Sequence, residues 1–492
     1  MNFTRALSVV SLSGAALLVG ATSTMAAPIP NQPGNASTRD FYGHSAVAAP
    51  VTVPAAPQNP FMAANSWNNI HNDASMTDTY QGKGPMGRKP AVKSAVSTGE
   101  CASITFNSKG QIVAVCIASN SYVTLMKPKS FKVLARTKMP KVQSSSSDGK
   151  SDYTDYAGGY FYLDNEDRPV VSTATLHLIT YQRQGHKFVP VQDADLTSVI
   201  TTGDSIQSAL PDFAGNKWFI TKQGVVGFVP LGSTTPVSTQ LPAGEQIGNS
   251  FSMDSTGGVY IVSTKALYRF DVVNGQPSVT WREAYTNTGT QKPGQVSPGS
   301  GTTPTIMAGD EFVAIADNGD PESVTVYYTN KQSNNVQKYC AVPVFTKGAS
   351  ATENSLVAVN NSLFIENNYG YTGAKATTAG RTTTPGLARV DVGTGGNCTL
   401  VWTNTKLSAP TVVPKFSAKA GLLYTYTKPA RKDKKDPWYW TAIDFETGKR
   451  VYSAKVGSGV LYNNNYASLY IGPNGDGYLG VIGGIVRIYD TN

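Results

Sequence analysis

The segment Trp440-Thr-Ala-Ile-Asp444-Phe-Glu-Thr-Gly448 recurs in two variants, Leu267-Tyr-Arg-Phe-Asp271-Val-Val-Asn-Gly275 and Leu387-Ala-Arg-Val-Asp391-Val-Gly-Thr-Gly395. In each copy an apolar strand leads into Asp, Gly follows four residues later, and the next strand carries an aromatic residue. These aromatic residues are Tyr452, Trp281 and Trp402, in the same order. A fourth copy, Ile485-Val-Arg-Ile-Tyr489-Asp490, stops where the chain ends.

The repeated segment predicts a β-hairpin. Asp can cap the turn with its carboxylate, Gly can take the positive φ that the turn requires, and the aromatic side chain can fill the space between neighbouring sheets. A second repeated unit is a turn followed by a short apolar strand. It occurs at Asn107–Cys116, Asp254–Ser263, Asn360–Glu366 and Asn474–Gly480.

Together the two units divide the chain into segments of about 40–50 residues, the size of a four-stranded propeller blade. We therefore predict an all-β fold, a single β-propeller with about eight blades, with seven as the alternative. The predicted blades are 99–140, 153–196, 204–244, 245–286, 300–345, 350–405, 408–457 and 463–490.

The last predicted blade lacks its outer strand, because the chain stops at the turn before it. A closed ring needs that strand from elsewhere, since an open sheet edge tends to pair with other chains. The segment around Trp67–Tyr80 lies just before the first predicted blade. We expect this N-terminal segment to supply the missing strand and close the ring.

The N-terminus has the features of a signal peptide over residues 1–26. Arg5 precedes the apolar run Ala6–Gly20, and Thr24-Met25-Ala26 offers small residues at the cleavage positions. Residues 27–60 predict an extended or disordered leader, and the propeller takes residues 61–492. Because no later apolar segment approaches the length of a transmembrane helix, we expect a soluble secreted or periplasmic protein. An uncleaved N-terminal anchor is the alternative.

The cysteines favour disulfides, because export leads to an oxidising compartment and their number is even. In the hairpin around Asn107-Ser-Lys-Gly110, Phe106 faces Gln111, and counting outward places Cys101 opposite Cys116. A disulfide there closes a loop worth roughly 3 kcal/mol in the chain-entropy treatment. The remaining pair, by elimination, is Cys340 with Cys398. Buried free thiols are the alternative.

Net charge bears on the choice of partner. The formal charge is +9, or +8 once Arg5 leaves with the signal peptide, and it concentrates in Lys127–Lys141 and Lys428–Lys435. Either run could meet an anionic envelope surface or be a solvated hairpin tip. Nucleic acid is not an expected partner, because no groove-reading motif or stacking platform accompanies the charge. We expect a monomer.

Ala442-Ile-Asp-Phe-Glu-Thr-Gly-Lys449, followed by Tyr452, resembles the blade signature of the quinoprotein alcohol-dehydrogenase-like, or PQQ-like, propeller superfamily. That signature is Ala-x-Asp-x-x-x-Thr/Gly-Gly-Lys followed by Trp, for which Tyr stands here. The resemblance implies propeller architecture over most of residues 95–490. The stretches at Asn59-Pro-Phe-Met and Asn69–Asp73 also resemble uncharacterised secreted bacterial proteins.

The chain departs from the quinone-dependent members of that superfamily. Those enzymes carry a vicinal Cys-Cys pair and a calcium ion held by Glu, Asn and Asp beside a catalytic Asp. This chain has no Cys-Cys pair, and the full calcium set cannot be placed on it. Many members that bind no quinone serve as assembly scaffolds or binding platforms.

Polar residues follow the second strands of two neighbouring predicted blades, after Ile315 and Ile365. Carboxylate and amide oxygens brought together there would suit Ca²⁺, whereas turn chemistry alone also uses such residues. Carbohydrate would favour aromatic and amide partners in the same loops. The candidate calcium ligands are Asp317, Asn318 and Glu366, and the candidate ligand-binding residues are Asn367, Asn368, Tyr369 and Tyr371.

The segment Trp67-Asn-Asn-Ile-His71-Asn-Asp73 is the densest polar cluster that contains a His. On an alternating strand Asn69, His71 and Asp73 would point to one face. His71 and Asp73 could then form a catalytic acid/base pair. The alternative is that all three hydrogen-bond the ring closure.

Motifs of other enzyme classes are absent from the sequence, including G-x-S-x-G, the P-loop and H-E-x-x-H. We therefore expect a secreted propeller that binds a ligand or partner, such as carbohydrate or a cell-envelope polymer, without a redox cofactor. A hydrolase or lyase with a Ca²⁺-supported site at the central channel is the alternative. A quinone-dependent dehydrogenase comes third, and whether the protein is an enzyme stays open.

Overall fold

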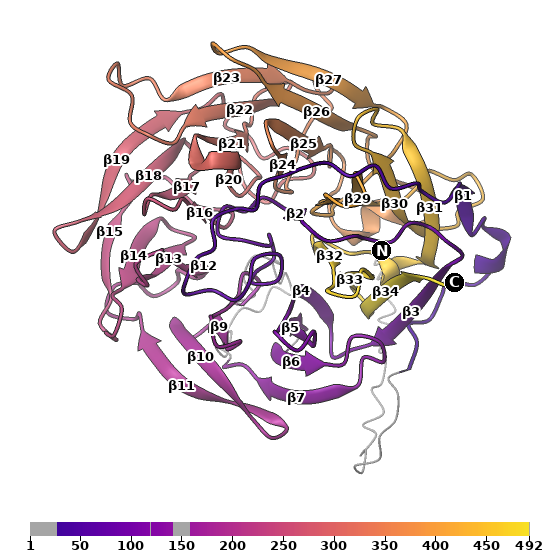
Figure 1. The fold of residues 1–492 in the computed structure, drawn as a ribbon, viewed down its shortest axis with the longest axis horizontal. Helices are drawn as coiled ribbons and strands as arrows, with labels where there is room; N and C mark the ends of the chain where they lie inside the picture. Colours follow the sequence, from indigo (N-terminus) through magenta and orange to yellow (C-terminus); the bar gives the residue numbers. More distant parts are fainter. Residues whose placement is uncertain (1–26, 119, 141–157, 492) are drawn as a thin grey trace, which may run out of the picture.

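The computed structural model describes residues 27–118, 120–140 and 158–491, so the predicted signal peptide lies outside the described residues. Eight sheets are arranged around a central axis as an eight-bladed β-propeller (Figure 1). The predicted all-β propeller with about eight blades is confirmed. No helix within the described ranges is long and apolar enough to cross a membrane.

Each of the first four blades is an antiparallel sheet whose innermost strand comes first in the sequence. Blade one contains β4 (Glu100–Phe106), β5 (Ile112–Ile117), β6 (Tyr122–Met126) and β7 (Val133–Lys138). Blade two contains β8 (Tyr162–Leu163), β9 (Pro169–Ser172), β10 (His177–Gln184) and β11 (Lys187–Asp195). Blade three contains β12 (Ile206–Pro211), β13 (Lys217–Thr221), β14 (Val225–Val229) and β15 (Val237–Gln240), and blade four β16 (Ser252–Met253), β17 (Val259–Val262), β18 (Ala266–Val273) and β19 (Gln276–Ala284).

The last four blades follow the same order, apart from N-terminal strands that are added to blades seven and eight. Blade five contains β20 (Thr305–Ile306), β21 (Phe312–Ala316), β22 (Ser323–Tyr328) and β23 (Lys338–Pro343), and blade six β24 (Val357–Val359), β25 (Ser362–Glu366), β26 (Leu387–Val392) and β27 (Cys398–Asn404). Blade seven contains β28 (Lys415–Ser417), β29 (Leu422–Thr427), β30 (Pro437–Asp444) and β31 (Arg450–Ser458), and blade eight β32 (Leu469–Ile471), β33 (Gly477–Val481) and β34 (Gly484–Asp490). The described 3₁₀ turns are η1 (Asn35–Ser37), η3 (Ala308–Asp310), η4 (Ala374–Thr377) and η5 (Val460–Tyr462).

An N-terminal strand completes blade eight, as predicted. The strand is β3 (Pro90–Val96), which pairs antiparallel with β34 along its whole length. The expected location, Trp67–Tyr80, was wrong. That segment cannot run straight, because Asn72, Met76 and Asp78 all have positive φ. β3, in contrast, is extended and lies directly before blade one.

Residues 59–80 form instead a plug across one end of the central channel, seen as the indigo ribbon in front of the blades (Figure 1). β2 (Thr79–Tyr80) pairs parallel with β28. Polar contacts of the plug reach the inner strand of every blade. In blade order they are Thr105 to Trp67, Ala63 to Leu163, Asn59 to Pro211, Met253 to Ala74, Ile306 to Ser75, Ala358 to Thr77, Phe416 to Asp78 and Trp67 to Ile471.

The predicted leader lies along blade seven. β1 (Phe41–Gly43) pairs with β31, outside the other strands of that blade. Further along, Ala49 N–H donates to Ala420 O at 3.1 Å and Val51 N–H to Ala418 O at 2.9 Å. The division between leader and propeller stays a prediction.

Both predicted disulfides are present. Cys101–Cys116 lies within blade one, and Cys340–Cys398 joins the outer strands of blades five and six. The expected hairpin register was wrong by one residue, because Phe106 lies opposite Ile112. A bulge in β4 before Ser103 compensates, so the two cysteines still meet.

The repeated hairpins confirm the predicted glycine and tryptophan roles. Gly275, the turn glycine after β18, has φ 73°. Trp281 Nε1 donates to Thr329 O in the next blade at 2.8 Å, and Trp402 Nε1 donates in the same way to Phe445 O at 3.0 Å. These tryptophans therefore join neighbouring blades.

The predicted role of the repeated Asp holds for one copy only. Asp444 caps its turn, accepting from Thr447 N at 2.8 Å. Asp271 and Asp391 instead pair with the Arg two residues earlier, at 3.0 Å from Arg269 and 2.7 Å from Arg389. An Arg on the same face of the strand offers a stronger, charged partner than the turn amides do.

Candidate functional site

The plug closes one end of the central channel, and the remaining space is a funnel with a volume of about 130 Å³. Its floor is formed by Ile70 and His71 of the plug. Its wall receives residues from all eight blades, because every inner strand begins at this end. One lining residue from each blade, in order, is Ser103, Tyr160, Gln207, Asn249, Val296, Asn354, Val413 and Tyr466.

His71 is held at the floor of the funnel by a carboxylate. Its side chain is buried, and Nδ1 lies 2.9 Å from Asp78 Oδ2. With Asp78 ionised and the ring neutral, the proton sits on Nδ1 and Nε2 carries the lone pair. Among the described residues Nε2 has no hydrogen-bond partner. His71 lines the funnel, and its Nε2 is a buried, oriented acceptor that no described residue uses.

Asp78 is itself fixed by Lys415, the first residue of inner strand β28. Both side chains are fully buried, and Lys415 Nζ contacts Asp78 Oδ1 and also donates to Ile70 O at 2.6 Å. Burial lowers the pKa of Lys415, and Asp78 opposes that shift. Asp78 thus joins the plug to blade seven and orients the imidazole at once.

Glu353 adds a second ionisable group to the funnel wall. Its Oε2 accepts from Val296 N at 3.0 Å, and burial raises its pKa to about 8. At neutral pH the side chain is therefore mainly a neutral carboxylic acid, which can donate a proton or a hydrogen bond. The funnel combines this acid with the His71 acceptor.

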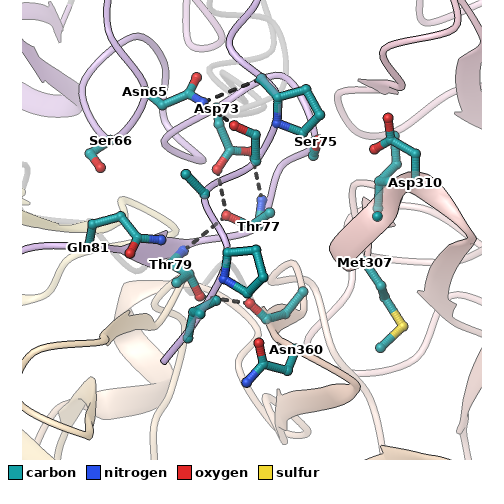
Figure 2. A pocket seen from close by; sticks show the side chains of 18 residues that line it. Asn65, Ser66, Asp73, Ser75, Thr77, Thr79, Gln81, Met307, Asp310 and Asn360 are labelled. Carbon is teal, nitrogen blue, oxygen red and sulfur yellow. Dashed lines mark hydrogen bonds between the residues drawn. The ribbon is translucent and has the colours of Figure 1, made fainter. Parts of the chain in front are cut away.

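Asp73 lies on the other side of the plug. It lines a cavity of about 40 Å³ with Ser75, Thr77 and Thr79 (Figure 2). Its carboxylate accepts from Thr77 N at 3.2 Å and Thr77 Oγ1 at 2.5 Å, and burial raises its pKa to about 7. The structure does not pair Asp73 with His71, whose carboxylate partner is Asp78, because the plug is not an alternating strand.

The candidate calcium ligands are not brought to the funnel. Asp317 Oδ1 accepts from Gly319 N at 2.9 Å and Ser323 N at 2.8 Å, which is turn capping. Asn318 Nδ2 donates to Thr290 O at 3.0 Å, in the loop between blades four and five, and Glu366 Oε1 accepts from Thr425 Oγ1 of blade seven.

No three His, Cys, Asp or Glu side chains gather as a metal-binding group in the part of the chain that is described. A calcium site at Asp317, Asn318 and Glu366 stays a prediction.

The candidate ligand-binding residues support the rim of the funnel from behind. Asn368 is fully buried, and its Oδ1 accepts from Glu353 N at 2.9 Å and from Asn354 Nδ2 at 3.1 Å. Tyr371 donates from its hydroxyl to Asn465 Oδ1 at 2.7 Å. Asn368 and Tyr371 therefore position two lining loops rather than line the funnel.

Asn367 and Tyr369 occupy the same loop. Asn367 Oδ1 accepts from Ala351 N at 3.2 Å and from Tyr369 N at 3.0 Å. Neither side chain is among those that line the funnel. Their predicted contact with a ligand stays a prediction.

Sequence reasoning found His71 but missed the groups that act with it. Asp78 lies five residues beyond the polar segment Trp67–Asp73, and only the turns of the plug bring it to His71. Lys415 and Glu353 are remote in sequence and carry no motif. Lys415 begins β28 and Glu353 lies just before β24, and these two inner strands meet around the channel only because the blades close into a ring.

Comparisons with known proteins do not assign a function. No family model matches the chain. An uncharacterised protein of Archaeoglobus fulgidus is 27% identical over 324 residues, which cover 60% of this chain and 62% of that protein. The match thus spans less than two thirds of the relative.

Two solved structures are similar at 11% sequence identity. BamB from Moraxella catarrhalis has a TM-score of 0.45 and matches 84% of this chain and 97% of its own. Streptogramin B lyase has a TM-score of 0.40 and matches 69% of this chain and 95% of its own.

Proposed function

We propose that the protein is an extracytoplasmic propeller that binds a small, uncharged, hydroxyl-bearing ligand, such as a sugar residue, in its funnel. The observation that carries this proposal is the buried Nε2 of His71, which is oriented by Asp78 and has no partner among the described residues. A buried acceptor without a partner costs about 1–3 kcal/mol, which a ligand hydroxyl could recover.

The other lining groups suit the same ligand. Asn249 and Asn354 offer amides, protonated Glu353 offers a donor, and Tyr160 and Val296 offer apolar surface. Charge at the floor is balanced, because Lys415 and Asp78 neutralise each other. The funnel volume of about 130 Å³ favours one sugar-sized group over a whole polymer.

Two disulfides support an oxidising location, either periplasmic or extracellular. The propeller architecture and the segment Ala442–Lys449 support a relationship to the PQQ-like superfamily.

The test is calorimetric titration at pH 7 with a panel of monosaccharides, uronic acids and sugar lactones. His71→Asn keeps a donor for Asp78 but removes the Nε2 acceptor. We expect it to weaken binding at least about tenfold, as loss of a buried hydrogen bond implies. His177→Asn is the matched control, because His177 pairs with Asp193 at 2.7 Å on the exposed edge of blade two. Equal affinity of all three proteins, or no binding across the panel, would contradict the proposal.

A hydrolase or lyase is the second candidate, favoured by an oriented imidazole and a neutral carboxyl group on one cavity. His71 would take a proton from the substrate, and Glu353 would give one to the leaving group. Catalysis would be supported if the parent protein turned over a bound lactone or glycoside. Both His71→Asn and Glu353→Gln should then lose turnover, while Glu353→Gln should still bind the substrate. Binding without turnover leaves the protein a binding protein.

A further inference from the structure

A second, larger recess is lined by residues of blades six and seven and of β1. Its volume is about 690 Å³, compared with about 130 Å³ for the funnel. The lining comes from the loop before β26, the connection between the two blades, the loop before β30, and strands β29, β30, β31 and β1. We call this recess the blade-six/seven groove; its lining includes Thr383, Lys406, Tyr439, Arg450 and Tyr42.

The charge lining the groove is entirely positive. Lys406 and Arg450 are exposed on it, and no carboxylate is among its described lining residues. Neither cation forms an ion pair with another described residue. Cations left without a counter-charge around one recess raise the local concentration of anions there.

Arg450 is held in place rather than left as a free surface chain. Its guanidinium lies over the Tyr42 ring, 5.1 Å from the centroid, and Tyr42 packs edge-on against Tyr439 at 5.5 Å. Arg39 also lies over Tyr42, at 4.8 Å. The planar guanidinium is thereby pre-organised for a carboxylate, which it can bind through two hydrogen bonds.

The groove also carries hydroxyl groups suited to sugars. Thr382, Thr383, Thr384, Ser408, Thr427 and Ser453 line it. Thr383 is 3% exposed, and its Oγ1 has no partner among the described residues. A buried hydroxyl that is unsatisfied on the wall of a recess gains most from a ligand that supplies its own hydroxyls.

The basic run that supplies part of this wall is anchored in the protein. Lys428, at its start, is buried and lies 3.0 Å from Asp436 Oδ1, which closes the loop. Pro429 and Ala430 then line the groove, and Arg431 pairs with Asp433 further along the loop. The start of the run is thus anchored beside the groove, whereas its tip at residues 432–434 is exposed to solvent.

We propose that the blade-six/seven groove binds a carboxylated polysaccharide, with Arg450 and Lys406 contacting uronate carboxylates and Thr383 contacting a sugar hydroxyl. Nucleic acid fits less well, because Tyr439 is buried and Tyr42 is covered by Arg39 and Arg450, so neither offers a free face for base stacking. A membrane fits less well, since the cations lie on a recess and not on a flat face.

The test is calorimetric titration of the full mature chain with oligogalacturonate at low salt. The double variant Lys406→Gln/Arg450→Gln should weaken binding at least tenfold, and Thr383→Val should weaken it several-fold. The control Lys265→Gln/Lys419→Gln removes the same charge from exposed positions elsewhere and should leave affinity unchanged. His71→Asn should also bind oligogalacturonate normally, which separates this site from the funnel.

Three results would overturn the proposal. The first is equal weakening in the charge-matched control. The second is undiminished binding of methyl-esterified oligogalacturonate, which lacks the carboxylates. The third is tighter binding of single-stranded DNA or of anionic phospholipid vesicles than of oligogalacturonate, since either would mark a general polyanion surface.

Discussion

His71 acquires its properties from residues that do not neighbour it in a strand. Asp78 lies seven positions later, and positive φ at Asn72 and Met76 turns the chain so that the two side chains meet. Lys415, on an inner strand, balances the buried carboxylate. A buried charge pair is costly unless its hydrogen bonds are complete, and the contact of Lys415 with Ile70 O helps to complete them.

The sequence identified His71 from residue type and clustering, and this position does line the channel. It could not identify Asp78 as the partner, because that required the turn geometry of the plug. The calcium candidates illustrate the converse. Asp317 and Asn318 have the residue types of a metal site, yet in the structure Asp317 caps its own turn and Asn318 donates to the loop between blades four and five.

Glu353→Gln tests the buried acid of the funnel. The pKa of Glu353 is about 8 in the folded protein, against 4.5 for an unperturbed Glu. Between these pH values the folded state binds more protons than the unfolded chain, so the free energy of unfolding falls as pH rises. The Gln side chain of the variant does not ionise, so the variant keeps its free energy of unfolding as pH rises. At pH 8 this free energy should exceed that of the parent by at least about 1 kcal/mol, whereas at pH 4.5 the two should be similar.

Urea unfolding at the two pH values measures this difference. Glu311→Gln, at an exposed carboxylate, should show no such change between them. If Glu353→Gln altered stability equally at pH 4.5 and pH 8, Glu353 would not be a buried neutral acid.

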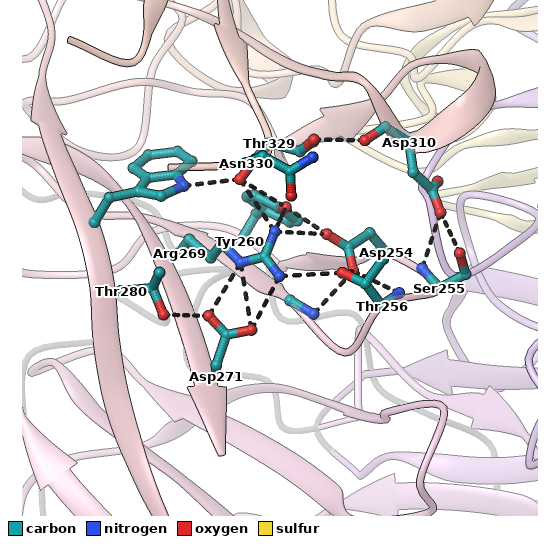
Figure 3. A network of polar contacts seen from close by, with 12 residues as sticks. Asp254, Ser255, Thr256, Tyr260, Arg269, Asp271, Thr280, Asp310, Thr329 and Asn330 are labelled. Carbon is teal, nitrogen blue, oxygen red and sulfur yellow. Dashed lines mark hydrogen bonds and ion pairs between the residues drawn. The ribbon is translucent and has the colours of Figure 1, made fainter. Parts of the chain in front are cut away.

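At the scale of the blade, Arg and Trp of the repeated hairpin join one sheet to the next. Arg269 in β18 pairs with Asp254 at 3.1 Å and Asp271 at 3.0 Å, and donates to Thr329 O of blade five at 3.1 Å (Figure 3). Trp281 reaches the same carbonyl. The Asp-to-Gly spacing predicted the hairpin correctly. It did not predict the contact of Arg269 with the next blade, since that depends on the position of Thr329 O.

Arg269→Met should destabilise the propeller by about 3–5 kcal/mol, because it removes the cation that pairs with the buried Asp254 and with Asp271, together with one of the hydrogen bonds to Thr329 O. Thermal unfolding followed by circular dichroism measures the change. Arg183→Met, at an exposed hairpin position, should leave the melting temperature almost unaltered. Equal effects of the two substitutions would show that the contact with Thr329 O does not hold the blades together.

The whole ring depends on the N-terminal segment in two ways. β3 covers the edge of β34, and the plug contacts the inner strand of each blade. The missing outer strand could be inferred from sequence, because the repeat stops early. The plug could not, since its contacts involve single residues spread over the whole chain.

A chain starting at residue 97 lacks both the plug and β3, so we expect it to aggregate or to unfold at much lower urea than the parent. A chain starting at residue 59 keeps both and should unfold cooperatively. Light scattering and urea titration compare them. A monomeric 97–492 chain with the parent's stability would contradict closure of the ring by this segment.

The function proposed for the molecule depends on the atom that the plug offers to the funnel. The most direct measurement is the nitrogen NMR spectrum of His71 in the ¹⁵N-labelled protein at pH 8, assigned by comparison with His71→Asn. We predict the neutral tautomer with the proton on Nδ1, and an Nε2 resonance that moves when a funnel ligand is added. A proton on Nε2, or an Nε2 resonance unaffected by a bound funnel ligand, would contradict it.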